Sequence, residues 1–311
     1  MTTPVASHGS GRAPSLSGVA AGTTARARSM SARAAHVSTC AVRLVVRAIG
    51  SLVISFGLLV ALLLLWEATL TGRNLFQFKP PSTILTTLWR TWLSGPPSHL
   101  FMTQAVWHDI VPSLARALGG WALGAIIGIT VGIVAGHFPR ARGYIDPVVS
   151  YLRSIPKAAL VPTFIIVFGA SEVTRVIAIA ASTIWLVLMN TMHGVRTLDP
   201  VMRDTGRVFH IPPWKQLTHI ILPFAAPKIF AALRVTLSLA LKVMLVAEWL
   251  LTDYGLGFYL LDKQRNYEIA EMWSALFMLA ILGYLLNVGF LLIERRVLRW
   301  HDGVHGRTEA Q

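Results

Sequence analysis

Residues 117–138 read ALGGWALGAIIGITVGIVAGHF, a run of 22 residues without Lys, Arg, Asp or Glu. A helix of this length crosses a hydrocarbon core of about 30 Å, because each residue adds about 1.5 Å. Five more apolar runs occur, at residues 48–66, 158–171, 176–195, 235–251 and 272–293. The run at 158–171 is short, and the run at 235–251 contains Lys242 and Glu248. We expect an all-α membrane protein with six transmembrane helices; a four-helix alternative would leave two apolar loops in water.

The composition supports a membrane protein. The chain is 54% hydrophobic and 14% charged, with a mean hydropathy of +0.59, whereas soluble domains are about 25% charged. The net charge of +14 would suggest nucleic acid in a soluble protein. Here the basic residues lie between apolar segments, so we expect a lipid bilayer as partner and no nucleic acid. Cys40 is the only cysteine, and the histidines lack H-E-x-x-H spacing, so we expect no disulfide and no metal site.

The distribution of Lys and Arg predicts the orientation. In the six-helix arrangement, 19 of them fall on the side of both termini and 6 on the other side. The positive-inside rule then places both termini in the cytoplasm of a multi-pass plasma (inner) membrane protein. Residues 1–47 contain no Asp or Glu and are rich in Ser and Arg, which predicts a disordered basic cytoplasmic tail; an organelle transit peptide is the alternative. Residues 301–311 form a second cytoplasmic tail, and residues 48–300 form the transmembrane domain.

Five glycines recur every fourth residue within the second span, at Gly120, Gly124, Gly128, Gly132 and Gly136. Residues four apart lie on nearly the same helix face, so the glycines predict a smooth ridge for close helix packing in lipid. The alternative is that glycine is common in membrane helices. Neither interpretation assigns any chemistry to the ridge.

A long basic connection at residues 196–230 follows the fourth span. Asp199 suits an N-cap and Pro200 the first helical position. His210 and the pair Pro212-Pro213 should end this helix, and a second short helix should begin near Trp214. Two short helices with a sharp turn predict a docking knob outside the membrane.

This connection resembles the coupling loop of binding-protein-dependent ABC importer permeases. That loop is written EAA, three residues, Gly, nine residues, Ile-x-Leu-Pro. Here the acidic position is Asp204, Thr205 and Gly206 replace the alanines, and His210 replaces the glycine of a left-handed turn. The remaining positions match, at Ile220, Leu222 and Pro223. The departures put the strength of ATPase coupling in question more than the fold.

Other stretches resemble the subgroup that imports nitrate, sulfonates, taurine and related small anions, or pyrimidine precursors. They include Pro80-Pro81-Ser82, Leu152–Ala158, Asn190-Thr191 and Gly255-Leu256-Gly257. The resemblance covers about residues 48–300 and implies the MetI-like fold of type I ABC importer permeases. It further implies pairing with a second permease, as a homodimer or with a different chain. Cytoplasmic ATPase subunits and an extracytoplasmic substrate-binding protein complete the implied assembly.

The resemblance also implies which residues act. The coupling-loop candidates are Asp204, Thr205, Gly206, His210, Trp214, Leu222 and Pro223. We expect Asp204 at the start of the knob, His210 in its turn, and Trp214, Leu222 and Pro223 packed against the ATPase. The chain has no G-x-x-x-x-G-K-[ST], so it is not an enzyme by itself. ATP and Mg belong to the partner ATPase, and we expect no cofactor in this chain.

Two charges lie inside the fifth span, Lys242 and Glu248. Such charges cost roughly 2.5–3.5 kcal/mol each on insertion scales and are by default functional. Six residues apart at about 100° each, they face different directions and should not pair with each other. They therefore either line the pore, together with Asn190, or have structural partners on another helix or subunit. Arg116 and Arg234 lie near span ends, where long side chains can snorkel.

Two other classes of protein remain to be weighed. A secondary carrier that acts without an ATPase would need an internal repeat, which the sequence lacks, and would leave the basic loop without a role. An intramembrane enzyme would need paired His or carboxylates within the spans, and no such pair occurs. We therefore expect the permease subunit of an ATP-driven importer for a small, anionic solute.

Overall fold

The computed structural model describes residues 57–58, 60–70, 78–97 and 101–299, and every regular element in these ranges is a helix. The chain divides into two units, residues 1–71 and 72–311. In the first, Val60–Leu70 form a short apolar helix. Most of the predicted first span at 48–66 lies outside the described residues, as do the predicted tails at 1–47 and 301–311.

Four helices of the second unit are long and apolar enough to cross a membrane. They are α3 (Val111–His137), α6 (Glu172–Arg196), α9 (Leu222–Leu251) and α11 (Ile269–Val297). Each contains one of the predicted spans, which confirms an all-helical membrane fold. A π-helical turn at Val106–Ile110 precedes α3.

The third predicted span differs from the expectation. The chain returns between α3 and α6 through two helices, α4 (Pro139–Ser154) and α5 (Leu160–Phe168), which are bent by 86° and together can make one broken span. Ile155 is extended, with ψ of 129°, because the residue before a proline avoids the helical region and Pro156 follows. The predicted span at 158–171 is therefore represented by α5, the second half of this bent pair, which ends at Phe168.

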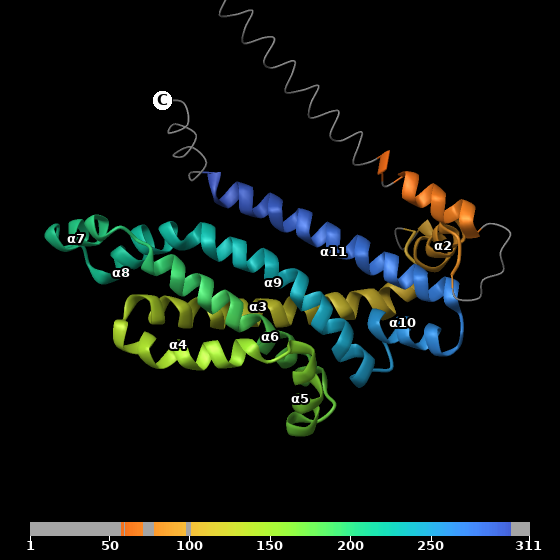
Figure 1. The fold of residues 1–311 in the computed structure, drawn as a ribbon, viewed down its shortest axis with the longest axis horizontal. Coiled ribbons are helices and arrows are strands. Elements are labelled where there is room, and N and C mark those ends of the chain that lie inside the picture. The colour runs from red at the N-terminus through yellow and green to blue at the C-terminus, as the bar shows by residue number, and fades with distance from the viewer. Residues whose placement is uncertain (1–56, 59, 71–77, 98–100, 300–311) are drawn as a thin grey trace, which may run out of the picture. The chain divides into compact units, whose positions relative to one another are not determined.

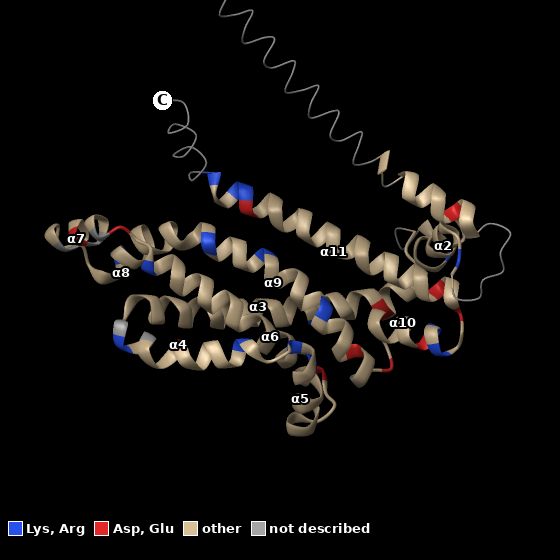
Figure 2. Ribbon diagram, in the orientation of Figure 1, with Lys and Arg blue, Asp and Glu red and all other residues tan. Residues whose placement is uncertain are grey.

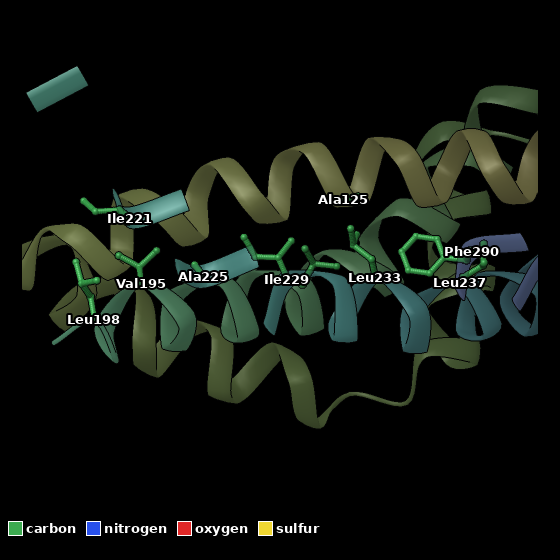
Figure 3. Close-up of a cluster of buried hydrophobic side chains, with 10 residues drawn as sticks. Ala125, Val195, Leu198, Ile221, Ala225, Ile229, Leu233, Leu237 and Phe290 are labelled. Atoms are coloured by element: carbon green, nitrogen blue, oxygen red, sulfur yellow. The ribbon is translucent and has the colours of Figure 1, made fainter. Parts of the chain in front are cut away.

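The centre of the bundle is the contact of α6 with α3 and α9. One stripe of side chains begins at Ile221, just before α9, and continues along α9 at every fourth residue. It points into this contact (Figure 3), at Ile221, Ala225, Ile229, Leu233 and Leu237. All five side chains are buried, against residues that include Val195 of α6 and Phe290 of α11. This period is typical of a helix with one core-facing side.

The two ends of the bundle differ. At one end, α2 (Pro81–Leu88) packs on α11, and α10 (Leu256–Arg265) packs on α9 and α11; we call it the α10 end (Figure 1). Trp92 is fully buried there, with its ring 5.1 Å from that of Tyr259. The opposite end carries α7 (Pro200–Val208) and α8 (Pro213–Gln216), and we call it the α7–α8 end. Acidic residues gather at the α10 end (Figure 2).

Candidate functional site

A helical knob, residues 199–223, forms the tip of the α7–α8 end (Figure 1). The side chain of Asp199 accepts a hydrogen bond from the backbone N–H of Val201 at 2.9 Å, so it caps α7 as its residue type predicts. After α7 and α8, a π-helical turn at Leu217–Ile221 leads directly into α9. A force on the knob is therefore transmitted to a membrane helix without an intervening loop.

The turn between α7 and α8 is held by a side chain that the sequence interpretation missed. His210 has φ of 51°, the left-handed conformation expected at the family's glycine position. The backbone N–H of Ile211 donates to the Gly206 carbonyl at 3.0 Å. The side-chain amide of Gln216 donates to the carbonyls of Gly206 at 3.2 Å and Ile211 at 2.8 Å. A side chain at position 206 would press on Gln216, since an added Cβ would lie 3.2 Å from its Cδ.

The knob exposes a group of apolar side chains, which are Val201, Met202, Val208, Phe209 and Trp214. Trp214 is 72% exposed. Asp204, Thr205 and His210 are also exposed, whereas Leu222 and Pro223 begin α9 and line an apolar groove of about 410 Å³. Apolar groups clustered on the surface indicate a protein partner.

The glycine ridge lies against α6. Each glycine meets the residue 59 positions later, in the pairs 120 with 179, 124 with 183, 128 with 187, 132 with 191 and 136 with 195. A Cβ added to any of these glycines would lie 2.1–2.9 Å from an atom of α6. The constant offset means that α3 and α6 run parallel, so the segment between them must cross back. The ridge thus sets the closest helix contact of the bundle.

A buried polar cluster joins α3, α6 and α9 at the α10 end. Glu248 of α9 is fully buried, and its carboxylate accepts hydrogen bonds from Arg116 Nη1 at 2.6 Å, Ser113 Oγ at 2.7 Å and the N–H of Gly257 at 2.8 Å. Arg116 is 4% exposed and also binds both carboxylate oxygens of Glu172 at 2.8 Å. Arg116 therefore bridges two carboxylates rather than snorkelling to water.

The turn before α10 completes this cluster. The phenolic O–H of Tyr254 donates to the carboxylate of Glu172 at 2.5 Å, and the guanidinium of Arg116 lies 4.6 Å from the centre of the Tyr254 ring. Asp109 accepts the N–H of Gly255 at 3.0 Å. Glu248 thus has, within this chain, the structural partner that the sequence analysis gave as the alternative to a pore-lining role. Sequence reasoning missed Ser113 and Tyr254, because neither differs locally from an ordinary helix or loop residue.

A second, partly exposed group of charges lies where α10 meets the start of α11. Lys263 of α10 lies 2.5 Å from a carboxylate oxygen of Glu268 and 3.1 Å from one of Glu271. The hydrogen bond with Glu268 raises the pKa of Lys263 and lowers the pKa of the Glu268 carboxyl. This ion pair ties the end of α10 to the start of α11.

The remaining pore candidates lie in different settings. Asn190 is half-buried, and its amide donates to the carbonyl of Leu186 in its own helix at 2.8 Å. Lys242 is exposed and forms no hydrogen bond or ion pair within the part of the chain that the structure describes. It lines a groove of about 380 Å³ between α9 and α11, together with Arg234, Ser238 and Asn287. The structure does not bring Lys242, Asn190 and Glu248 into one site.

Comparison with known proteins agrees with this architecture. A family model described as binding-protein-dependent transport system inner membrane component matches residues 128–300. A permease of Bacillus subtilis named for aliphatic sulfonates is 30% identical over 207 residues, which cover 67% of this chain and 75% of that protein. The taurine transport system permease protein of Escherichia coli is 28% identical over 253 residues, 81% of this chain and 90% of that protein. The fold resembles a chain of the inward-facing MetNI methionine ABC transporter, with a TM-score of 0.53 at 19% identity over 65% of this chain and 98% of that chain.

Proposed function

The chain belongs to the family of binding-protein-dependent transport system inner membrane components, and we propose that it forms the pore for a small sulfonate-like anion. As a permease subunit of an ABC importer it works with ATPase subunits and a substrate-binding protein. ATP hydrolysis belongs to the ATPase chain, so a carrier that acts without an ATPase is not retained.

The anionic substrate is inferred from two sources. Relatives are named for taurine and for aliphatic sulfonates, and both are small molecules with an oxyanion group. Lys242 adds a cation to an apolar helix and has no partner among the described residues. A positive charge in a wet pore favours passing anions. We propose Lys242 as a pore-lining residue. Glu248 and Asn190 are not included in the proposed pore lining, because Glu248 is paired with Arg116 and Asn190 donates to a carbonyl of its own helix.

The observation that carries the proposal is the exposed knob at residues 199–223. We infer that its apolar tip at Phe209 and Trp214 docks on the ATPase, and the left-handed turn at His210 connects its two short helices. Because the ATPase is cytoplasmic, we place this end of the bundle in the cytoplasm. The positive-inside distribution of charge supports cytoplasmic termini as well. Closure of the ATPases on ATP would move the knob and, through it, α9, as alternating access requires.

Reversal of one charge on the knob tests this proposal. Asp204 is exposed on α7, so Asp204→Arg should leave folding and insertion intact but abolish co-purification of the ATPase and substrate-stimulated ATP hydrolysis. The matched control is Asp253→Arg, because Asp253 is equally an exposed carboxylate but lies at the α10 end. The control should retain the ATPase. Normal co-purification and hydrolysis with Asp204→Arg would show that the knob is not the coupling element.

A further inference from the structure

We propose that the groove between α9 and α11 is a transit site for an oxyanion, with Lys242 supplying the charge and Ser238 and Asn287 donating hydrogen bonds. This inference rests on the proposed function, because it places a specific anion site on the path of that importer. None of the relatives' names assigns such a site, and the sequence singled out only Lys242.

The geometry of α9 makes the groove polar on one side. Arg234, Ser238 and Lys242 follow one another at intervals of four residues, so they lie on one face of the helix, and Asn287 faces them from α11. A second cavity of about 500 Å³ adjoins along the same two helices and shares Ser238 and Lys242. Apart from these two residues, its lining is apolar or glycine. The polar positions are therefore confined to one stretch of an otherwise apolar passage.

Of the two cationic side chains that line this groove, Arg234 and Lys242, only Lys242 lacks an ion-pair partner among the described residues. The guanidinium of Arg234 is paired with Glu294 of α11. Lys242 forms no hydrogen bond or ion pair with any residue that the structure describes. It also lies nine residues, or about 14 Å, before the end of α9, which is farther than a lysine side chain reaches. Lys242 therefore cannot reach the interface at the α10 end by snorkelling.

A second copy of the chain does not supply the missing negative charge. The four spanning helices and the π-helical turn before α3 contain five carboxylates. Each has a partner within the chain: Asp109 with Gly255, Glu172 and Glu248 with Arg116, Glu271 with Lys263, and Glu294 with Arg234. An identical subunit placed against the groove would bring the same five engaged groups. A mobile anion remains as the group that can neutralise Lys242.

The hydrogen-bond donors of the groove, on Lys242, Ser238 and Asn287, suit an oxyanion that binds and is then released. A lysine ammonium is a compact point charge with three rotatable donors, and it lacks the rigid fork by which arginine holds an anion in two hydrogen bonds. The hydroxyl of Ser238 and the amide of Asn287 add neutral donors on opposite walls. Conduction requires binding that is favourable enough for entry and weak enough for release. One unpaired lysine with two neutral donors meets both conditions for a sulfonate or carboxylate.

A thiol probe tests the groove without knowledge of the substrate. In a chain whose Cys40 is replaced, Ser238→Cys is introduced, and the whole complex with its ATPase is treated with two methanethiosulfonate reagents of similar size. One carries an ethylsulfonate and the other an ethyltrimethylammonium group. We expect the sulfonate reagent to react faster, and Lys242→Met to lower the ratio of the two rates about tenfold or more. Lys242→Arg should restore the ratio.

The control thiol is Ser94→Cys, at an exposed position away from the knob, where the rate ratio should not respond to Lys242→Met. A thiol at position 238 that reacts with neither reagent would mean that the groove faces lipid, and an unchanged ratio would mean that Lys242 does not act on its contents. Loss of assembly in both Lys242→Met and Lys242→Gln would reveal a fixed partner. Each of these results overturns the transit site. The proposed function fails separately, since it depends on the ATPase response to Asp204→Arg.

Discussion

Replacement of Arg116 by methionine should destabilise the protein far more than replacement of Lys263, although both cations bridge two glutamates. The side chain of Arg116 is 4% exposed and that of its partner Glu248 is fully buried. Lys263 is 21% exposed, and its partners Glu268 and Glu271 are 45% and 38% exposed. The two sites thus compare a buried and an exposed ion pair in one fold.

The expected loss of stability depends on whether each substitution leaves a buried or an exposed carboxylate without its cation. Arg116→Met leaves the Glu248 carboxylate buried, with only Ser113 and the N–H of Gly257 as donors. Removal of one partner of a buried pair costs about 3–5 kcal/mol, because the other charge stays uncompensated. Lys263→Met removes an exposed pair, which is worth about 0–1 kcal/mol. A difference of at least about 2 kcal/mol is therefore expected.

Thermal denaturation of the purified permease in detergent measures the difference. At about 2–4 °C per kcal/mol for a domain of this size, Arg116→Met should lower the melting temperature by about 6 °C or more, and Lys263→Met by about 4 °C or less. The double substitution Arg116→Met with Glu248→Met should recover part of the loss, because it removes both charges of the buried pair. Equal shifts for the two single substitutions, or strict additivity in the double one, would refute the buried pair.

Three further predictions concern the ridge, the knob and the orientation. Gly124→Ala should lower the free energy of unfolding by about 1–3 kcal/mol through overpacking, since the new Cβ would lie 2.1 Å from Thr183 Oγ1. The control Gly119→Ala meets nothing within 4 Å and should be neutral or stabilising by up to about 1 kcal/mol. Equal effects of the two substitutions would contradict the close packing of the glycine ridge. His210→Val should lower the coupling of ATP hydrolysis to transport, because a β-branched residue does not tolerate φ of 51°. His210→Gly should retain this coupling. Full coupling in the valine variant would mean that the left-handed turn is not needed. Cysteines at positions 5 and 305, after replacement of Cys40, should escape an impermeant reagent outside intact cells, and labelling of either would contradict the cytoplasmic termini.

The sequence predicts those features that depend on local pattern. Runs of apolar residues identify the four long helices because helix length in a membrane is set by bilayer thickness. The cap at Asp199 and the left-handed turn at His210 follow from conformational preferences of single residues. The ridge of glycines predicts a close contact, but the identity of the partner helix depends on tertiary structure. Only the structure assigns that contact to α6 and gives the register of Gly124 with Thr183.

The sequence does not predict features that depend on contacts between residues far apart in the chain. The α4 helix contains charged residues and a proline at position 147, so its sequence resembles a loop. Its contacts with α3 and α6 hold it in the bundle. Arg116 and Glu248 lie 132 positions apart, and no local pattern connects them. A charge within a span is by default assigned to function, which is why the sequence placed Glu248 among the pore candidates although the structure gives it a buried partner.

The two charges of the fifth span therefore have separable roles, and the separation has a mechanical consequence. The cluster around Glu248 joins α3, α6, α9 and the turn before α10, and none of the residues described in it belongs to α11. The groove at Lys242, in contrast, has α11 as its second wall. A shift of α11 relative to α9 would change the width of the groove while the cluster stays intact. Substitution of Arg116 should then act on stability and substitution of Lys242 on anion passage, each with little effect on the other.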